Sequence, residues 1–314
     1  MRKKRLLKYI IPSLTMILGI IIAVIGISVG AKEDYIKQLN LTDIQAVVDP
    51  DGIAGLDINI TYTDVDIIAS NDVDKIEINA NNNSRKYLNY SVSGHIFRLK
   101  YDFNKWHEMI SIPGLVKQAG KIQIIIPADI SLQDIQIKTG SGYNKIKYLT
   151  AEKIFIDCGL GNNNIECITS DYIEVNNGLG KVLAENISSD KISLSCGAGK
   201  ADVKNFHSEN AEIKVGMGEL KLNGIIEGNS SIECGVGNVK ATLYGDKNDY
   251  AFNIINGNIN VNGKDISNNT EGKYNIDVEC GIGNIDILFK WGECLWKNYT
   301  DLKAIKCYAV SALA

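Results

Sequence analysis

A glycine unit recurs at a fixed interval through the second half of this chain of 314 residues. Gly-x-Gly or Gly-x-x units begin at Gly140, Gly159, Gly178, Gly197, Gly216, Gly235, Gly257 and Gly281. The first five intervals are equal, at about 19 residues, and the last two are longer. Repeats of this length are typical of solenoids, in which each unit buries its apolar face against its neighbours. The sequence therefore predicts a stack of similar units.

Apolar residues alternate with polar residues before each glycine unit. Ile154, Ile156 and Cys158 precede Gly159 in this way, and the other units repeat the pattern. Alternation with period two is typical of a half-buried β-strand. The residue between the two glycines keeps the same parity, so we expect it to point inward as well. This middle residue is Leu160, Leu179, Ala198, Met217, Val236 or Ile282.

The inward parity shifts by one residue after the second glycine, for example to Val182 and Ala184. A glycine that bends or bulges the chain can absorb such a shift. Each glycine unit is therefore predicted to turn a corner between two strands, and a later apolar residue fills the next corner. The predicted corner glycines are Gly140, Gly142, Gly159, Gly161, Gly178, Gly180, Gly197, Gly199, Gly216, Gly218, Gly235, Gly237, Gly257, Gly281 and Gly283. The predicted corner-filling residues are Leu149, Ile168, Ile187, Phe206 and Ile225.

The predicted fold class is all-β, a single-chain β-solenoid (β-helix) with coils of about 19 residues stacked about 4.8 Å apart. No unit has the helical period that a crossover helix needs. The solenoid is expected to cover residues 52–290, with regular repeats over 140–290. Within residues 52–139, the segment 81–119 holds most of the aromatic side chains, and it predicts a hairpin plus a long loop that caps the first coil.

The N-terminus predicts one transmembrane helix. Residues 10–31 have no charged side chain, and 22 helical residues span about 33 Å, enough to cross a bilayer. Five basic residues precede this run, which predicts that residues 1–9 are cytoplasmic and that the C-terminal domain is extracytoplasmic. A cleaved signal peptide is the alternative. Residues 32–51 are expected to be a juxtamembrane linker, and residues 291–314 a tail or cap.

Four cysteines occupy one position of alternate units: Cys158, Cys196, Cys234 and Cys280. In a sequential stack they would lie about 9.6 Å apart, beyond the reach of a disulfide. We therefore expect free core thiols, with Asn177, Val215 and Asn256 in the layers between them. A ladder of metal-bound thiols is an alternative, and Cys294 and Cys307 could form a disulfide.

Cofactor and metal sites are not indicated. No helix follows the glycine units, as a dinucleotide site requires, and the repeat is about twice as long as that of calcium-binding glycine repeats. Residues 32–314 carry a net charge of about −9, which argues against nucleic acid as a partner. Glu152, Asp171, Asp190 and Glu209 recur at one unit position with His207 nearby, but no nucleophile is spaced to use them. The chain is predicted not to be an enzyme.

Outward asparagines are frequent in the repeats, including Asn162, Asn163, Asn164, Asn176, Asn205, Asn223 and Asn238. Rows of amides and carboxylates could contact the hydroxyl groups of a cell-wall polymer. The simpler interpretation is that they solvate strands and satisfy turns.

The units CGLGN, NGLGK, CGAGK and CGVGN, preceded by KIQIIIPADISLQDIQIKTGSG, resemble the DUF4097 family of β-strand-repeat, adhesin-like proteins over about residues 40–290. The resemblance implies a β-solenoid ectodomain on a bacterial membrane anchor at the cell envelope. We expect a non-enzymatic, adhesin-like or scaffold module that binds wall polymer or an envelope protein. One alternative is an accessory of an envelope-stress system that contacts a membrane sensor. A second is a polysaccharide-active β-helix enzyme.

Overall fold

The structure is a computed structural model that describes residues 41–102, 120–265, 268 and 271–290. The described residues form strands and one short 3-10 helix, Lys247–Asp249. The strands are β1 (Leu41–Val48), β2 (Gly55–Tyr62), β3 (Asp64–Ser70), β4 (Ile76–Ser84), β5 (Leu88–Ser93), β6 (Ile96–Tyr101), β7 (Lys121–Pro127), β8 (Asp134–Ser141), β9 (Tyr143–Lys147), β10 (Thr150–Cys158), β11 (Asn162–Asn177), β12 (Lys181–Cys196), β13 (Lys200–Val215), β14 (Glu219–Ile226), β15 (Ser230–Tyr244), β16 (Tyr250–Val261), β17 (Lys264–Asp265) and β18 (Tyr274–Lys290).

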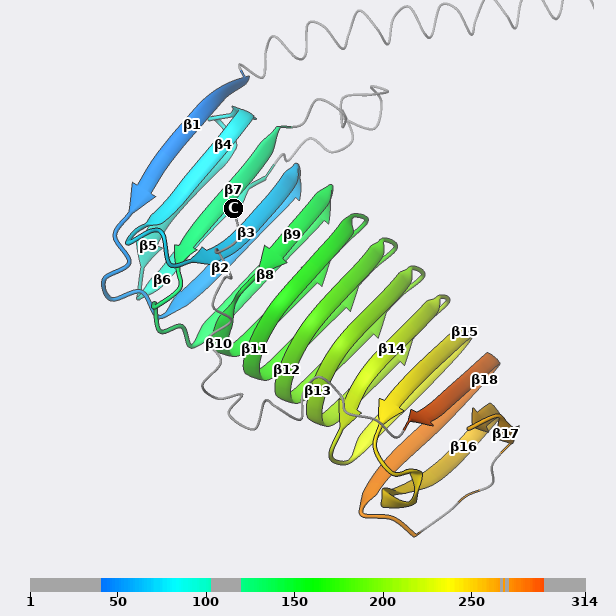
Figure 1. Cartoon of the computed structure of the whole chain (residues 1–314). Helices are drawn as coiled ribbons and strands as arrows, with labels where there is room; N and C mark the ends of the chain where they lie inside the picture. The colour runs from blue at the N-terminus through cyan, green and yellow to red at the C-terminus, as the bar shows by residue number, and fades with distance from the viewer. Residues whose placement is uncertain (1–40, 103–119, 266–267, 269–270, 291–314) are drawn as a thin grey trace, which may run out of the picture.

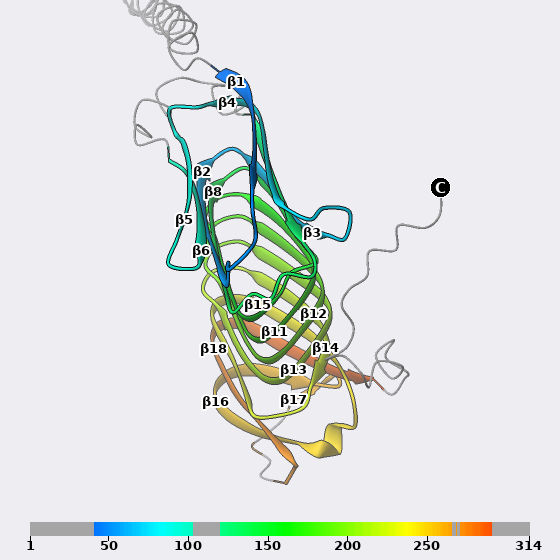
Figure 2. The ribbon, with the colours of Figure 1, turned by 90° about the vertical axis from the view of Figure 1, so that its left-hand side faces the viewer.

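The strands coil into a stack with two walls, and the predicted all-β, solenoid-like fold is confirmed (Figure 1). We call the wall of segments before each glycine unit the pre-glycine face, and the wall after it the post-glycine face. Figure 2 looks along the stack and shows β2 and β8 on one wall and β3 on the other. Each long strand β11, β12 and β13 runs from the post-glycine face, around a corner, to the pre-glycine face.

Successive regular coils pair in parallel, and the register offset between them equals the sequence period. Ile173 lies beside Ile192 in the next coil, and Ile192 lies beside Ala211. The inward positions before the glycines are fully or nearly fully buried in most coils, as the alternation predicted. The hydrophobic core is thus a column of side chains between the two walls, because equivalent residues stack on one another.

The corner opposite the glycine units has a conformation that the sequence analysis did not identify. Tyr148, Cys167, Asn186 and Asn205 occupy equivalent positions there and have positive φ angles of 61°, 56°, 59° and 50°. Asparagine tolerates this left-handed region better than most residues, which accounts for two of the four positions.

The residues that follow this second corner fill it from inside. Leu149, Ile168, Ile187 and Phe206 are buried there, as expected. The expectation for Ile225 is wrong. The register slips in this coil, so that Gly224 lies beside Phe206 and Ile226 becomes the fully buried residue.

The beginning of the stack does not follow chain order. The coil of β2 and β3 lies between β6 and β7 on one side and β8 and β9 on the other. β1 pairs antiparallel with β4 and buries Ile44, so residues 41–48 are part of the sheet and not of the expected linker. The hairpin expected within residues 81–119 is formed by β5 and β6, whereas residues 103–119 lie outside the described residues.

The end of the stack also departs from chain order. β18 pairs with β15 on one side and with β16 on the other, so the last long strand is inserted between two earlier ones (Figure 1). The expected sequential stacking is therefore wrong for the final coils. Asn256, which was expected in the core, is exposed, because the register between β16 and β18 is irregular on both sides of it.

The predicted single-pass membrane localisation requires correction. Across the part of the chain that the structure describes, none of the helical structure has the length and apolar character needed to cross a bilayer. The apolar run 10–31 and the tail 291–314 lie outside the described residues.

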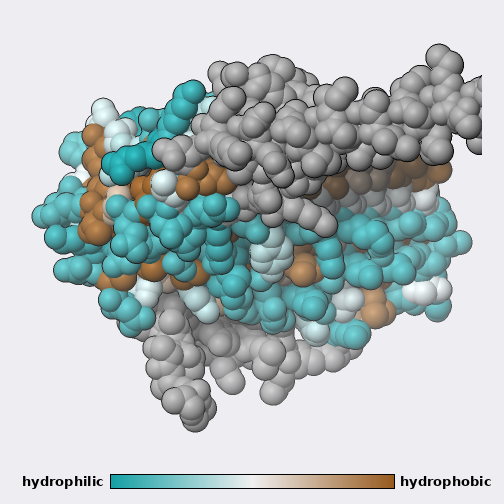
Figure 3. Space-filling view, turned by 90° about the horizontal axis from the view of Figure 1, so that it is seen from above, coloured by the Kyte–Doolittle hydropathy of each residue, from teal (hydrophilic) through white to brown (hydrophobic). Residues whose placement is uncertain are grey.

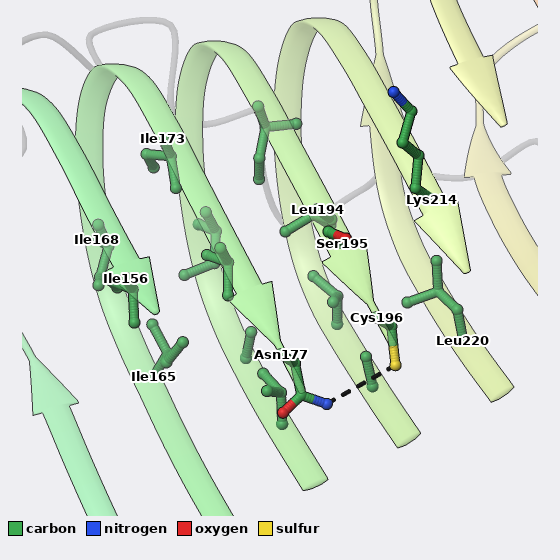
Figure 4. A pocket seen from close by; sticks show the side chains of 17 residues that line it. Ile156, Ile165, Ile168, Ile173, Asn177, Leu194, Ser195, Cys196, Lys214 and Leu220 are labelled. Carbon is green, nitrogen blue, oxygen red and sulfur yellow. Dashed lines mark hydrogen bonds between the residues drawn. The ribbon is translucent and has the colours of Figure 1, made fainter. Parts of the chain in front are cut away.

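The core between the walls contains a small void in the regular coils, of about 20 Å³ (Figure 4). Branched aliphatic side chains such as Ile173 and Leu194 line it, together with Asn177. The amide nitrogen of Asn177 donates to the carbonyl of Gly180 at 3.1 Å and lies 3.7 Å from the sulfur of Cys196. The amide oxygen of Asn177 is buried without a hydrogen-bond partner among the described residues, and an unpaired buried polar group costs about 1–3 kcal/mol.

Candidate binding surfaces of the solenoid

The glycine corners are held by close contact between neighbouring coils. A methyl carbon added to Gly197 would lie 2.8 Å from the carbonyl oxygen of Gly178 in the preceding coil, and one added to Gly199 would lie closer still to that of Gly180. Both glycines have φ angles outside the left-handed region. The corner therefore excludes side chains by the close approach of two backbones.

The backbone ladder continues through each corner. Gly197 donates to Asn177 O at 2.8 Å, Ala198 to Gly178 O at 2.9 Å, and Lys200 to Gly180 O at 3.2 Å. Hydrogen bonds at successive positions require the coils to stay at strand spacing around the bend. A side chain on either glycine would separate the coils and lengthen these bonds.

The middle residue of each glycine unit points into solvent, so the inward expectation is wrong. Alternation describes an extended strand, but at the apex of a corner the side chain lies on the convex side, away from the core. The side chains that make this apex ridge are Leu160 (64% exposed), Leu179 (63%), Met217 (66%), Val236 (48%) and Ile282 (71%), together with partly exposed Ala198. Figure 3 looks at the molecule from above and shows separate apolar patches between hydrophilic surface.

The exposure of the ridge gives a test of the corner geometry. Leu179→Ala is expected to change the free energy of unfolding by less than about 0.5 kcal/mol, as for other surface changes. Ile187→Ala, at a residue 3% exposed, is expected to cost about 2–5 kcal/mol. Urea unfolding of both variants measures the difference. Equal losses would show that the ridge packs against the core.

The four core cysteines are buried free thiols. Cys158 and Cys196 are separated by Asn177, as expected. Cys234 and Cys280 are direct register partners, however, because β18 is inserted beside β15. Burial raises the pKa of Cys158 to about 12 and that of Cys234 to about 11, so both thiols stay protonated at neutral pH. Cys294 and Cys307 lie outside the described residues.

The carboxylates at the recurring position do not assemble a metal centre. Glu152, Asp171, Asp190 and Glu209 are exposed and lie in line along the stack. Throughout the described ranges, no three His, Cys, Asp or Glu side chains are grouped so that they could hold a metal ion. His207 Nε2 lies 3.1 Å from Glu227 Oε2.

The pre-glycine face carries an open hollow of about 640 Å³ that the sequence analysis did not locate. It extends across β12, β13, β15, β18 and β16. Amide, hydroxyl and carboxylate groups dominate its lining, with one lysine. The lining residues are Lys191, Asn210, Ala211, Glu212, Asn229, Ser230, Ser231, Asn253, Asn275 and Asp277.

The hollow lies where the repeat is interrupted. β14 ends at Ile226 and β15 begins at Ser230, so the ladder is broken at this level. Ser230 Oγ accepts a hydrogen bond from the backbone amide of Ala211 at 2.9 Å, in place of a carbonyl. The longer intervals between glycine units after Gly235 show that the repeat becomes irregular at this end of the stack. They do not locate the hollow, because its position depends on the insertion of β18.

Several groups in the hollow are held in place by their neighbours. Asn229 Oδ1 accepts from the backbone amide of Asn275 at 3.1 Å, and Asn253 Nδ2 donates to Asp277 at 3.0 Å. Glu212 forms an ion pair with the exposed Lys214 at 2.6 Å, and this hydrogen bond lowers the pKa of the Glu212 carboxyl. Fixed donors and acceptors lose little freedom when they bind a ligand.

An aromatic pair adjoins the hollow on the same face. The rings of Phe155 and Tyr172 have centroids 5.6 Å apart, and Tyr172 Oη donates to Glu174 at 3.0 Å. Lys191 lines the hollow, and its Nζ atom lies 5.9 Å from the centre of the Tyr172 ring. The face therefore offers apolar ring surface next to hydrogen-bonding groups.

Comparisons with known proteins agree with this architecture. The model of the Toastrack DUF4097 family matches residues 53–288. The fold is similar to the crystal structure of a candidate adhesin from Bacteroides fragilis, with a TM-score of 0.52, 18% identity, and coverage of 78% of this chain and 97% of that chain. A candidate adhesin from Parabacteroides distasonis has a TM-score of 0.44 and 14% identity over 79% of this chain and 97% of that chain. No curated protein matches the sequence.

The family match covers most of the described solenoid, including both walls and the glycine corners. The similarity to the Bacteroides fragilis structure, at 18% identity, shows the shared fold. The chain belongs to the Toastrack DUF4097 family.

Proposed function

We propose that this protein is a non-enzymatic, adhesin-like module of the cell envelope that binds a hydroxyl-rich polymer along its pre-glycine face. The observation that carries the proposal is the hollow across five strands, lined by amides, hydroxyls and carboxylates beside an aromatic pair. Sugars bind through the same two kinds of contact, hydrogen bonds to hydroxyl groups and apolar contact with a ring face. The similar solved structure from Bacteroides fragilis is that of a candidate adhesin, which supports the adhesin-like role.

The stacked coils suit a polymer better than a single small molecule. Tyr172, Lys191 and Asn210 are register partners in three successive strands, and each is at least partly exposed. An extended chain could make similar contacts at successive coils, so that weak contacts add along its length. Glu212 is paired with Lys214, which leaves the face with hydrogen-bonding groups and little unbalanced charge in this coil.

The test is a binding assay of the purified protein with bacterial wall polysaccharide, by co-sedimentation, and with soluble neutral fragments of it, by calorimetry. The double variant Asn210→Ala, Asn275→Ala is expected to weaken binding by about tenfold or more, because two hydrogen-bonding side chains are removed. Asn164→Ala, on the post-glycine face, is the matched control and should bind normally. The proposal is wrong if the double variant binds like the control, or if the intact protein binds no neutral polysaccharide.

A further inference from the structure

The post-glycine face has a second open hollow, of about 500 Å³, with different chemistry. It lies on β13, β14 and β15, on the wall opposite the hollow described above. Three lysines and one carboxylate supply its charges. The lining residues are Asp202, Val203, Lys204, Asn205, Lys221, Leu222, Asn223, Lys240, Thr242 and Tyr244.

The lysines are placed where like charges gather. Lys221 and Lys240 are direct register partners on neighbouring strands, and both are exposed. Like charges directly opposite each other destabilise a sheet. Lys221 shares Glu219 with Lys200, at 3.6 and 3.2 Å respectively. Among the described residues, neither Lys204 nor Lys240 has a carboxylate oxygen within 4.0 Å.

Carboxylates confine this positive charge to a short stretch. Asp202 is the register partner of Lys221 on one side of the lysine pair, and Asp286 is the register partner of Lys240 on the other. Lys204, in a neighbouring row, has Glu185 as its register partner. Asp202 lines the hollow, whereas Glu185 and Asp286 do not. A long polyanion would meet these carboxylates at both ends, whereas a single anionic group fits between them.

Neutral hydrogen-bonding groups surround the lysines. Asn223 Nδ2 donates to Tyr244 Oη at 3.2 Å, which leaves the phenol hydrogen able to donate to a ligand. The hydroxyl of Thr242 lines the same hollow. Ammonium and hydroxyl donors around one space are the groups that bind an oxyanion together with adjacent hydroxyls.

We infer that this hollow binds a single oxyanion, a phosphate or a carboxylate, carried on a sugar or polyol. The site is separate from the polymer-binding face and uses none of its residues. Because the two hollows lie on opposite walls, one molecule of this protein can hold a neutral polymer on one side and an acidic saccharide on the other.

The experiment is a calorimetric titration of the full-length protein with glucose 6-phosphate, glucuronate and glucose at low ionic strength. At least one acidic sugar is expected to bind about tenfold or more tightly than glucose, and its affinity should fall as salt is added. The tighter of the two acidic sugars identifies the preferred oxyanion. The double variant Lys221→Gln, Lys240→Gln should lose this preference by about tenfold.

Two controls separate this site from a general effect of surface charge and from the polymer-binding face. Lys181→Gln, an exposed lysine on the same face but outside the hollow, should leave binding unchanged. Asn210→Ala, Asn275→Ala should also leave it unchanged, so this inference can fail or hold independently of the polymer proposal. Equal binding of glucose and both acidic sugars would overturn the inference, as would equal losses in the Lys221/Lys240 and Lys181 variants.

Discussion

Replacing Gly197 or Gly199 by valine is expected to reduce the free energy of unfolding by about 3 kcal/mol, the upper range for overpacking a close contact. A methyl carbon at Gly197 would lie 2.8 Å from Gly178 O, a carbonyl that also accepts the hydrogen bond from Ala198. A rotamer change cannot relieve the steric clash, because the added Cβ atom meets backbone atoms of the neighbouring coil. Thermal unfolding measures the effect, expected as a Tm lowered by roughly 6–12 °C.

Ala198→Val is the matched control, because it adds the same side chain between the two glycines. The equivalent apex positions of other coils already hold valine, leucine, methionine and isoleucine, all exposed. Its Tm is expected to stay within about 2 °C of the parent value. If Gly197→Val melts like Ala198→Val, the corners do not depend on close backbone approach.

Val278→Asp is expected to detach both β18 and β16 from the sheet, and not β18 alone. Val278 on β18 is fully buried, and an unpaired carboxylate there costs several kcal/mol. Among the described residues, β16 hydrogen-bonds to β18 and to the two-residue strand β17. Loss of β18 therefore removes nearly all of the ladder of β16. Hydrogen exchange should speed up by more than about a hundredfold in residues 250–261 as well as in β18.

The control places the same change one strand further out. Ile259→Asp in β16 is expected to free β16 while β18 keeps its ladder with β15. Residues 181–215 should stay protected in both variants, because stability in a stacked array depends mainly on neighbouring coils. Protection of β16 in the Val278 variant would mean that the coils stack in chain order after all.

Much of the solenoid could be predicted because its period is written in the sequence. The interval between glycine units is also the register offset between coils, as in the pairing of Ile173 with Ile192. Alternation then identified the buried positions before each glycine, because successive side chains of a strand point to opposite faces of the sheet. The apex residues such as Leu179 were misassigned because alternation assumes an extended chain, and the chain turns there.

The binding surfaces were less predictable. The pre-glycine hollow brings together Asn210 and Asn275, which are far apart in the sequence and lie on β13 and β18, on either side of β15. Lys221 and Lys240 of the second hollow follow the repeat, and their alignment is visible once the register is known. No local pattern marks either hollow, because each depends on where several coils lie relative to one another.

The sequence by itself determined the β-strand repeat, the two-walled coil and the positions of the corners, because stacking interactions are local and recur in every unit. Only the tertiary structure decided the order of the coils at both ends. The insertion of β18 between β15 and β16 places Cys280 beside Cys234 and brings Asp277 into the pre-glycine hollow. Every coil presents nearly the same strand edge for pairing, so the repeat does not specify which coil a given strand joins. Side-chain packing at the two ends of the stack determines the order there.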